Sequence, residues 1–144
     1  MDARELLARI IKCEAGGEGD NGMKGVATVV MNRVRVPDGE YRRIGQGDVR
    51  KIIYQKGQFD CMRPVLGGVA NPQTIWANPP EQIHYDIADW ALAGNRLFTI
   101  GSSLWYFNPF APCPYTFPYN GNGRFQVKIL KHCYYNPTAS YFET

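Results

Sequence analysis

The chain has 144 residues, of which 44% are hydrophobic and 20% are charged, and this composition predicts one globular domain over residues 1–144 with a substantial core. The net charge is only +3 and the basic residues are mostly dispersed, which argues against a nucleic-acid-binding protein. No apolar run is long enough to span a membrane, and the N-terminus lacks the basic start and apolar segment of a secretory signal, so we expect synthesis in the cytoplasm.

The first predicted element is an amphipathic helix that runs to about Glu14. Asp2 is a suitable N-cap, and Glu5 follows at the spacing of a capping box. Gly16 and Gly17 are expected to end the helix. Its apolar residues form one stripe, made of Leu6, Leu7, Ile10 and Ile11.

Glu14 is the first candidate for a catalytic residue. It falls one helical turn beyond Ile10 on the apolar face, so we expect its side chain to point inward. A carboxyl group between apolar surfaces can keep its proton near neutral pH, because desolvation disfavours the charged form. Such a group is suited to act as a general acid, for example in the cleavage of a glycosidic bond.

A second helix, which is apolar almost all round, is predicted over residues 22–34 and is expected to be central to the core. Glycine and proline then predict a long irregular loop over residues 37–47. Asp48 can cap a short helix that closes before Gly57.

The middle of the chain is expected to form a surface excursion over residues 61–78, which are rich in glycine and proline. An amphipathic helix then follows Pro79 and Pro80 and ends at Gly94. Its predicted buried face consists of Ile83, Ile87, Trp90 and Ala91.

The last third of the chain predicts two or three antiparallel strands. The evidence is the aromatic run at residues 104–107, the alternation of Phe125, Val127 and Ile129 with polar residues, and the segment 133–135. Helices followed by a small sheet correspond to an α+β fold.

A glycosidase needs a partner for Glu14, either a second carboxylate or a nucleophile that belongs to the substrate. The candidate carboxylates are Glu18, Asp20 and Asp60, although each is individually more typical of a helix cap or a loop anion. A glycan could bind in a groove lined by aromatic side chains, about half of which should instead be core residues of the sheet. These candidates are Trp105, Tyr106, Phe107, Tyr115, Phe117, Tyr119, Tyr134 and Tyr135.

The four cysteines are widely spaced, so no Cys-x-x-Cys pair indicates a metal site, and reduced, mostly buried thiols are the expected state. A Cys/His amidase or peptidase is an alternative function, with Cys13 as nucleophile and His132 as base. The position of Cys13 near the end of a helix argues against it, because a helix N-terminus is what lowers a thiol pKa. His132 and His84 are both more typical of structural histidines.

Several motifs in order resemble the spore cortex-lytic cell-wall hydrolase family of the SleB/CwlJ type. They are Glu14-Ala-Gly-Gly-Glu18, the helix with Asn32-Arg33 near its end, Ile53-Tyr-Gln-Lys-Gly-Gln-Phe59, Ser103-Leu-Trp-Tyr-Phe-Asn108-Pro109 and His132-Cys-Tyr-Tyr-Asn-Pro137. The short chain and the Cys113-Pro114 and His132-Cys133 elements are most similar to the CwlJ branch.

The resemblance implies a lysozyme-like α+β fold related to lytic transglycosylases, and we expect neither a cofactor nor a metal. It implies that the substrate is the cortex peptidoglycan of bacterial endospores, cut during germination. It also implies synthesis in the mother-cell cytoplasm without a signal peptide and deposition at the boundary of spore coat and cortex, where a coat protein is a candidate partner. A non-catalytic glycan-binding coat protein is a third candidate function.

The resemblance also assigns site residues. The family's catalytic glutamate corresponds to Glu14, in agreement with the argument from the apolar face. Expected substrate contacts are Glu18, Asn32, Phe59, Trp105, Tyr106, Asn108 and His132. For Asn32 we favour a different role, as a buried amide that ties the second helix to its neighbour.

Overall fold

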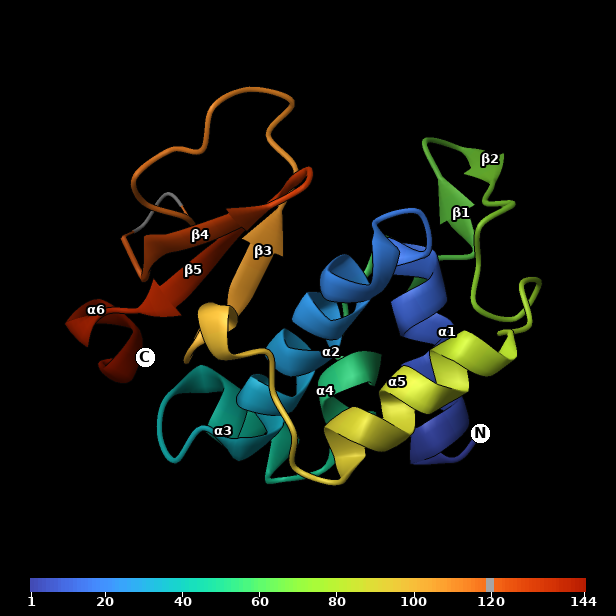
Figure 1. The fold of residues 1–144 in the computed structure, drawn as a ribbon, viewed down its shortest axis with the longest axis horizontal. Helices are drawn as coiled ribbons and strands as arrows, with labels where there is room; N and C mark the ends of the chain where they lie inside the picture. Colours follow the sequence, from blue (N-terminus) through green and yellow to red (C-terminus); the bar gives the residue numbers. More distant parts are fainter. Residues whose placement is uncertain (119–120) are drawn as a thin grey trace.

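The structure is a computed structural model that describes residues 1–118 and 121–144. Helices come first and a small antiparallel sheet follows, so the predicted α+β arrangement is confirmed (Figure 1). The helices are α1 (Ala3–Ala15), α2 (Gly19–Arg35), α3 (Glu40–Gly45), α4 (Val49–Tyr54), α5 (Gln82–Leu92) and α6 (Ala139–Phe142), with 3-10 turns η1 (Asp60–Met62) and η2 (Phe98–Ile100). The strands are β1 (Val65–Leu66), β2 (Val69–Ala70), β3 (Trp105–Phe107), β4 (Gly123–Ile129) and β5 (His132–Pro137).

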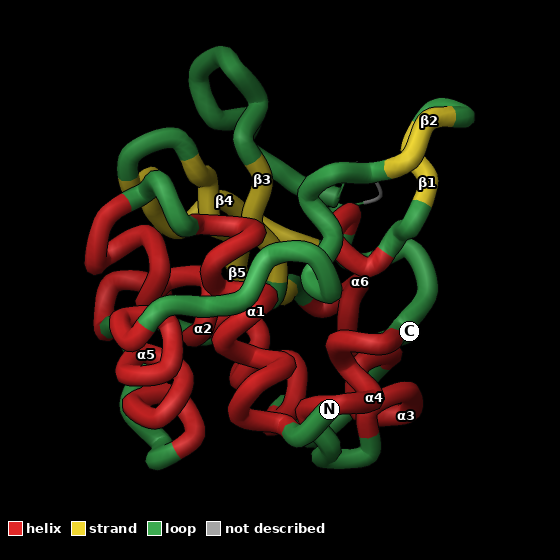
Figure 2. Tube along the Cα trace, turned by 90° about the vertical axis from the view of Figure 1, so that its right-hand side faces the viewer, coloured by secondary structure: helices red, strands yellow, loops and turns green. Residues whose placement is uncertain are grey.

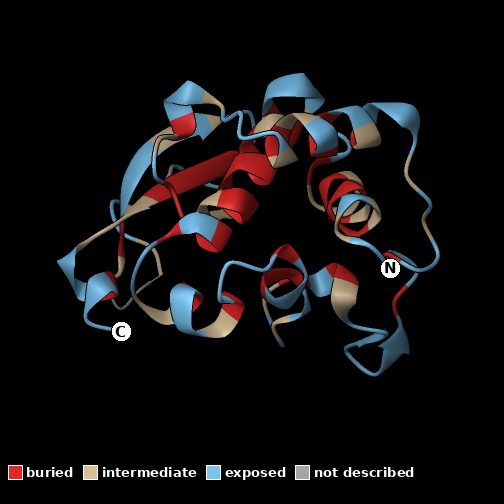
Figure 3. Cartoon of the chain, turned by 90° about the horizontal axis from the view of Figure 1, so that it is seen from below, coloured by how far each residue is buried: buried red, intermediate tan, exposed pale blue. Residues whose placement is uncertain are grey.

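Helix α2 contacts α1, α3, α4 and α5 and is central to the helical part, as predicted, and α1 packs against α2, α4 and α5. The start of α1 is as predicted, because the backbone N–H of Glu5 donates a hydrogen bond of 2.8 Å to Asp2 Oδ1. The helix ends at Ala15, and Gly16 is its C-cap. The predicted apolar stripe is fully buried. Buried residues lie where the helices and the sheet meet, whereas the outer faces are exposed (Figure 3).

Two predictions about the following segments need correction. Helix α2 begins at Gly19, earlier than expected, and ends at Arg35. The predicted loop over residues 37–47 contains the short helix α3. Its Tyr41 is buried against Tyr141, with ring centroids 5.9 Å apart, so packing against the C-terminal end of the chain holds this helix rather than any local sequence signal.

Helix α4 is capped by Asp48 as predicted, because Asp48 Oδ1 accepts a hydrogen bond of 2.8 Å from the backbone N–H of Arg50. Helix α5 is also present, but its buried face is turned by one position. His84 is buried and Ile83 is 41% exposed. The reason is a local bond, in which the backbone N–H of Glu81 donates to His84 Nδ1 over 2.9 Å and holds the ring inward.

The sheet has the strand order β3-β5-β4, and both pairings are antiparallel. Trp105 lies opposite Tyr135 and Tyr106 lies opposite Tyr134. Because side chains alternate along a strand, Trp105 and Tyr106 face opposite sides of the sheet. The predicted surface excursion contains the β1–β2 hairpin. Figures 1 and 2 show that this hairpin and the loop after β3 project on the same side of the molecule.

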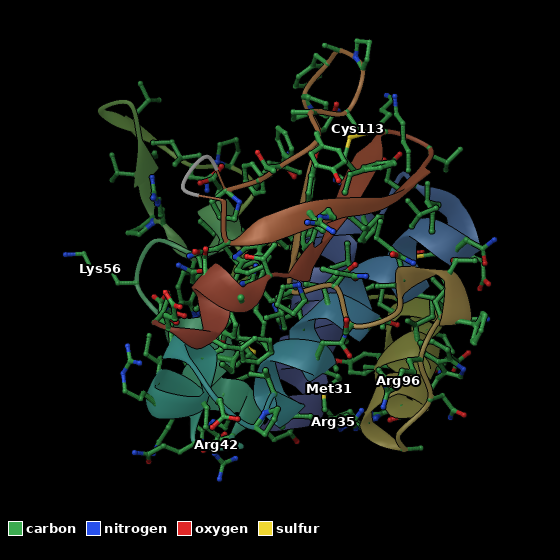
Figure 4. The ribbon with its side chains drawn as sticks, turned by 90° about the vertical axis from the view of Figure 1, so that its left-hand side faces the viewer. Met31, Arg35, Arg42, Lys56, Arg96 and Cys113 are labelled. Atoms are coloured by element: carbon green, nitrogen blue, oxygen red, sulfur yellow. A yellow bond between two sulfur atoms is a disulfide. The ribbon has the colours of Figure 1, made fainter. Side chains whose placement is uncertain are left out.

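The expectation of reduced thiols is wrong. Cys13 is bonded to Cys61, with a Cα–Cα distance of 6.4 Å, and Cys113 is bonded to Cys133, with a Cα–Cα distance of 5.8 Å. The first bond joins the end of α1 to η1, and the second joins the loop after β3 to β5 (Figure 4). Because the bonded cysteines are far apart in the sequence, their spacing alone does not show which of them meet in the folded chain. Among the described residues, no helix is both long and apolar enough to cross a membrane.

Candidate active site

A cavity of about 280 Å³ opens beside the last turn of α1, where Glu14 lines it. The other lining residues come from α2, from the segment around η1 and from the sheet and its loop. They are Arg33, Gln58, Phe59, Asp60, Tyr106, Phe107, Asn108 and His132. Segments that are distant in the sequence therefore meet around one carboxyl group.

The environment of Glu14 favours its protonated form. Burial is the main cause and the negative charge of Asp60 is the second, and together they raise the pKa of Glu14 from 4.5 to about 7. The positive charge of Arg33 and a hydrogen bond with Tyr106 act in the opposite direction. The expectation that Glu14 lies inward beyond Ile10 agrees with this environment.

Tyr106 is the hydrogen-bond partner of Glu14 and comes from β3. Burial, followed by the nearby Glu14 charge, raises the pKa of Tyr106 well above its ordinary value, so its hydroxyl stays protonated and can donate to the carboxylate. Its ring packs edge-on against His132, with centroids 5.1 Å apart. The aromatic ring is thus part of the wall, and the hydroxyl is part of the polar site.

Arg33 supplies a fixed positive charge at the bottom of the site. Its guanidinium is buried, and Nε donates a hydrogen bond of 2.7 Å to the carbonyl oxygen of Leu104. The same group lies over the rings of Tyr41 and Phe59, at 4.7 and 5.6 Å from the ring centroids. Nη1 also donates to Gln58 Oε1 over 3.3 Å. Sequence reasoning assigned no role to Arg33 or Gln58; the only signal was an arginine inside a nearly apolar helix.

Asp60 is the second carboxylate of the cavity. Its side chain is 77% exposed, and Oδ1 lies 3.9 Å from Nε of Arg63. Asp60 immediately precedes Cys61, and Glu14 immediately follows Cys13, so the Cys13–Cys61 bond joins the two segments that carry these carboxylates. Of the other candidates, Asp20 pairs with Lys24 at 3.0 Å and does not line this cavity.

Glu18 lies behind His132, at the start of α2. Its Oε1 is 3.5 Å from His132 Nδ1, and both side chains are largely buried. Burial lowers the pKa of His132, and the charge of Glu18 acts in the opposite direction. Glu18 and Glu14 also line a neighbouring cavity of about 480 Å³ at the α1–α2 connection. Glu18 and His132 therefore form the wall of the site against which the ring of Tyr106 packs.

The structure gathers five of the predicted site residues in the cavity and places Glu18 behind it. The five are Glu14, Phe59, Tyr106, Asn108 and His132. Asn32 is elsewhere, because its Nδ2 donates to the carbonyl oxygens of Gly101 and Ser103 at 3.0 and 2.9 Å, which confirms the structural role favoured from the sequence. Trp105 is also outside the cavity, buried against Tyr141 with centroids 5.5 Å apart.

Several of the aromatic candidates are core residues of the sheet, as expected, whereas Tyr106 and Phe107 line the cavity. Tyr134 and Tyr135 are fully buried, and Phe107 stacks on Phe117 with centroids 4.0 Å apart. Tyr115 is exposed and does not line the cavity. Tyr119 lies outside the described residues.

The alternative Cys/His site is not formed in the structure. Cys13 is held in a disulfide with Cys61 and has no thiolate to act as a nucleophile. Over residues 1–118 and 121–144, no group of three His, Cys, Asp or Glu side chains is arranged to hold a metal ion.

The sequence pattern of the Cell Wall Hydrolase family matches residues 17–135 of the chain. The chain belongs to the cell wall hydrolase family. CwlJ of Bacillus subtilis is 33% identical over 94% of this hydrolase and 85% of its own length. CwlJ of Halalkalibacterium halodurans is 31% identical over 94% of this chain and 86% of its own. These matches confirm the resemblance to the CwlJ branch that the motifs indicated.

Solved structures show the same fold for this cell wall hydrolase. The catalytic domain of the germination-specific lytic transglycosylase SleB from Bacillus anthracis superposes with a TM-score of 0.67 at 21% identity, over 93% of both chains. The catalytic domain of the Bacillus cereus SleB protein gives a TM-score of 0.68 at 22% identity, over 93% of this chain and 89% of that one. The expected lytic-transglycosylase-like fold is thereby confirmed.

Proposed function

We propose that this chain cleaves the glycan strands of peptidoglycan and that Glu14 is its general acid. The observation that carries the proposal is a carboxyl group with a pKa of about 7 in a cavity. At neutral pH a substantial fraction of such a group is protonated, which a leaving-group acid requires. Membership of the cell wall hydrolase family supports peptidoglycan as the substrate class.

In the proposed first step, the Glu14 carboxyl donates its proton to the oxygen that links N-acetylmuramic acid to N-acetylglucosamine. The bond from C1 of the muramic acid to this oxygen breaks, the oxygen leaves as a hydroxyl, and positive charge develops on the sugar ring. The nearby charge of Asp60 favours this cationic ring. The Tyr106 hydroxyl donates to the carboxylate that Glu14 becomes.

In the second step Glu14 acts as a base. It takes a proton either from the sugar's own 6-hydroxyl, whose oxygen closes on C1 to give an anhydro product, or from a water molecule that attacks C1. We favour the route through the 6-hydroxyl, because Asp60 is largely exposed and faces Arg63, which makes it a poor base for water. The alternative is the route through water, in which Glu14 takes the proton of the attacking water and Asp60, in the same cavity, is the second carboxylate.

We further propose that the substrate is spore cortex peptidoglycan and that the enzyme acts in germination. The support is the SleB neighbour, which is a germination-specific lytic transglycosylase, together with the CwlJ relatives. On the same grounds we propose synthesis in the mother cell, deposition between coat and cortex, and retention there by a coat protein.

Mass spectrometry of fragments released by the purified protein from decoated spore cortex tests the function. Anhydromuramic ends support the transglycosylase route, and reducing-end muramic acid supports the route through water. Fragments cut within the peptide would favour an amidase or peptidase and overturn the proposal. Binding to cortex without any released fragment would favour a non-catalytic coat protein.

A further inference from the structure

A second groove shares a lining residue with the Glu14 cavity. Its volume is about 520 Å³, and the buried ring of Phe59 lines both spaces. The groove lies between the end of α4 and the approach to α5, beside the β1–β2 hairpin. Its lining includes Tyr54, Met62, Val65 and Trp76. A chain-like ligand that leaves the Glu14 cavity past Phe59 would therefore enter this groove.

Two aromatic rings in the groove are unusually exposed. Trp76 is 53% exposed and Tyr54 is 44% exposed. In the described part of the chain neither ring stacks on another aromatic ring. Large exposed apolar surfaces beside a cavity mark binding sites more often than single scattered residues do. The flat faces of tryptophan and tyrosine suit the apolar faces of sugar rings.

The segment that carries Trp76 is firmly held. The preceding residue, Ile75, is fully buried, and its backbone N–H donates a hydrogen bond of 3.2 Å to the carbonyl oxygen of Cys61. Asn71 Nδ2 donates to the carbonyl oxygens of Asp60 and Arg63 at 3.1 and 3.0 Å. These bonds connect the segment that carries Trp76 to the η1 turn that carries Asp60. The position of Trp76 relative to the Glu14 cavity is therefore fixed.

Charge contributes little to this groove. Arg63 faces Asp60 at 3.9 Å, and Lys56 extends from the rim away from the molecule (Figure 4). A ligand in the groove would therefore be bound mainly by contact with the faces of the Trp76 and Tyr54 rings and less by ion pairs. The apolar and aromatic part of the lining favours a ligand with flat apolar faces.

We propose that the groove is a saccharide subsite, in which a sugar ring of the glycan strand beyond the cleaved linkage stacks on Trp76, with Tyr54 as a second contact. This inference rests on the proposed glycan-cleaving function and adds a residue-level assignment to it. The subsite accounts for the exposed rings of Trp76 and Tyr54 in a groove that shares Phe59 with the Glu14 cavity. It also makes the enzyme prefer long strands, because only they fill both the cavity and the groove.

Kinetics on substrates of two lengths test the assignment. With long, soluble glycan strands, Trp76→Ala lowers kcat/KM about tenfold through a higher KM, as expected for the loss of one stacking contact. With the shortest oligosaccharide that is cleaved, the same variant matches the parent. Trp76→Phe restores part of the loss, and Tyr54→Ala gives a smaller loss with the same dependence on length. Phe98→Ala is the matched control, since Phe98 is 93% exposed and lies outside both cavities.

Two results would overturn the subsite: an equal loss on short and long substrates, or no loss on either. Should the parent protein cleave neither substrate, the proposed function fails while the subsite can still be measured. Sedimentation with insoluble peptidoglycan then compares Glu14→Gln with Glu14→Gln/Trp76→Ala. Weaker binding of the double variant supports the subsite, and equal binding contradicts it.

Discussion

Asp60 lies beside Glu14 in one cavity, and its negative charge opposes the ionisation of Glu14. The Cys13–Cys61 disulfide links the residues that adjoin these two carboxyl groups in the sequence. The disulfide therefore holds together the two segments that carry Glu14 and Asp60, and the charge of Asp60 helps Glu14 to keep its proton. The combination of burial, a nearby anion and a hydrogen-bonding tyrosine explains how one glutamate can serve first as an acid and then as a base.

The Glu14 carboxyl should titrate with a pKa of about 7 in the folded protein, as measured by carbon NMR of its side chain. The folded state then binds more protons than the unfolded state between pH 4.5 and about 7, so the free energy of unfolding should fall as the pH rises through this range. This change in the pKa of Glu14 corresponds to an upper bound of ~3 to 4 kcal/mol in the free energy of unfolding. Denaturant unfolding should show that Glu14→Gln removes this pH dependence. A Glu14 titration at the ordinary value of a glutamate would contradict the account.

Asp60→Asn should lower the pKa of Glu14, because it removes the charge that opposes ionisation. The alkaline limb of the pH profile of kcat should therefore move to lower pH. Asp86→Asn, an exposed charge change on α5, should leave the limb in place. Equal shifts in the two variants would mean that net charge, and not the proximity of Asp60 to Glu14, sets the profile.

Tyr106→Phe should have the opposite effect. Its hydroxyl lowers the pKa of Glu14 by stabilising the carboxylate, so its loss should raise that pKa and move the alkaline limb of the kcat profile upward. The second step should also slow, because the carboxylate loses a donor. The same pH series that is run for Asp60→Asn measures this shift, and a limb displaced downward would rule out the assigned hydrogen bond.

Loss of the Cys13–Cys61 bond should affect both stability and the site. The bond closes a loop over a separation of 48 residues, which in the chain-entropy model corresponds to about 4 kcal/mol. A Cys13→Ser/Cys61→Ser variant should unfold at lower denaturant concentration and should show a lower Glu14 pKa, because η1 is freed to move Asp60 away. The Cys113→Ser/Cys133→Ser pair is the control: it should lose stability without a change in the Glu14 pKa.

Features that depend on local sequence were predicted well. The Asp2 and Asp48 caps, the stripe that ends at Glu14 and the strands of the last third all follow from short-range spacing, and the structure confirms them. The inward position of Glu14 needed only the helical period. The family motifs supplied Phe59, Tyr106, Asn108 and His132, which periodicity alone would not have gathered.

Features that depend on tertiary contacts were missed. Helix α3 exists because Tyr41 packs on Tyr141, about a hundred residues later. Both disulfides and the site roles of Arg33 and Gln58 likewise arise where distant segments meet. The prediction that both Trp105 and Tyr106 contact substrate was wrong for another reason. Side chains alternate along β3, so only one of the two can face Glu14, and the register of the sheet places Tyr106 there.

The most direct test of the account compares Glu14→Gln with Glu5→Gln, a change on the first turn of the same helix, for release of glycan fragments from decoated cortex. The Glu14→Gln protein should remain folded and lose activity by about 10²- to 10⁴-fold, the range expected for removal of a general acid. The Glu5→Gln protein should release fragments at the parent rate. Undiminished release by Glu14→Gln would show that another group protonates the leaving oxygen and would contradict the central claim.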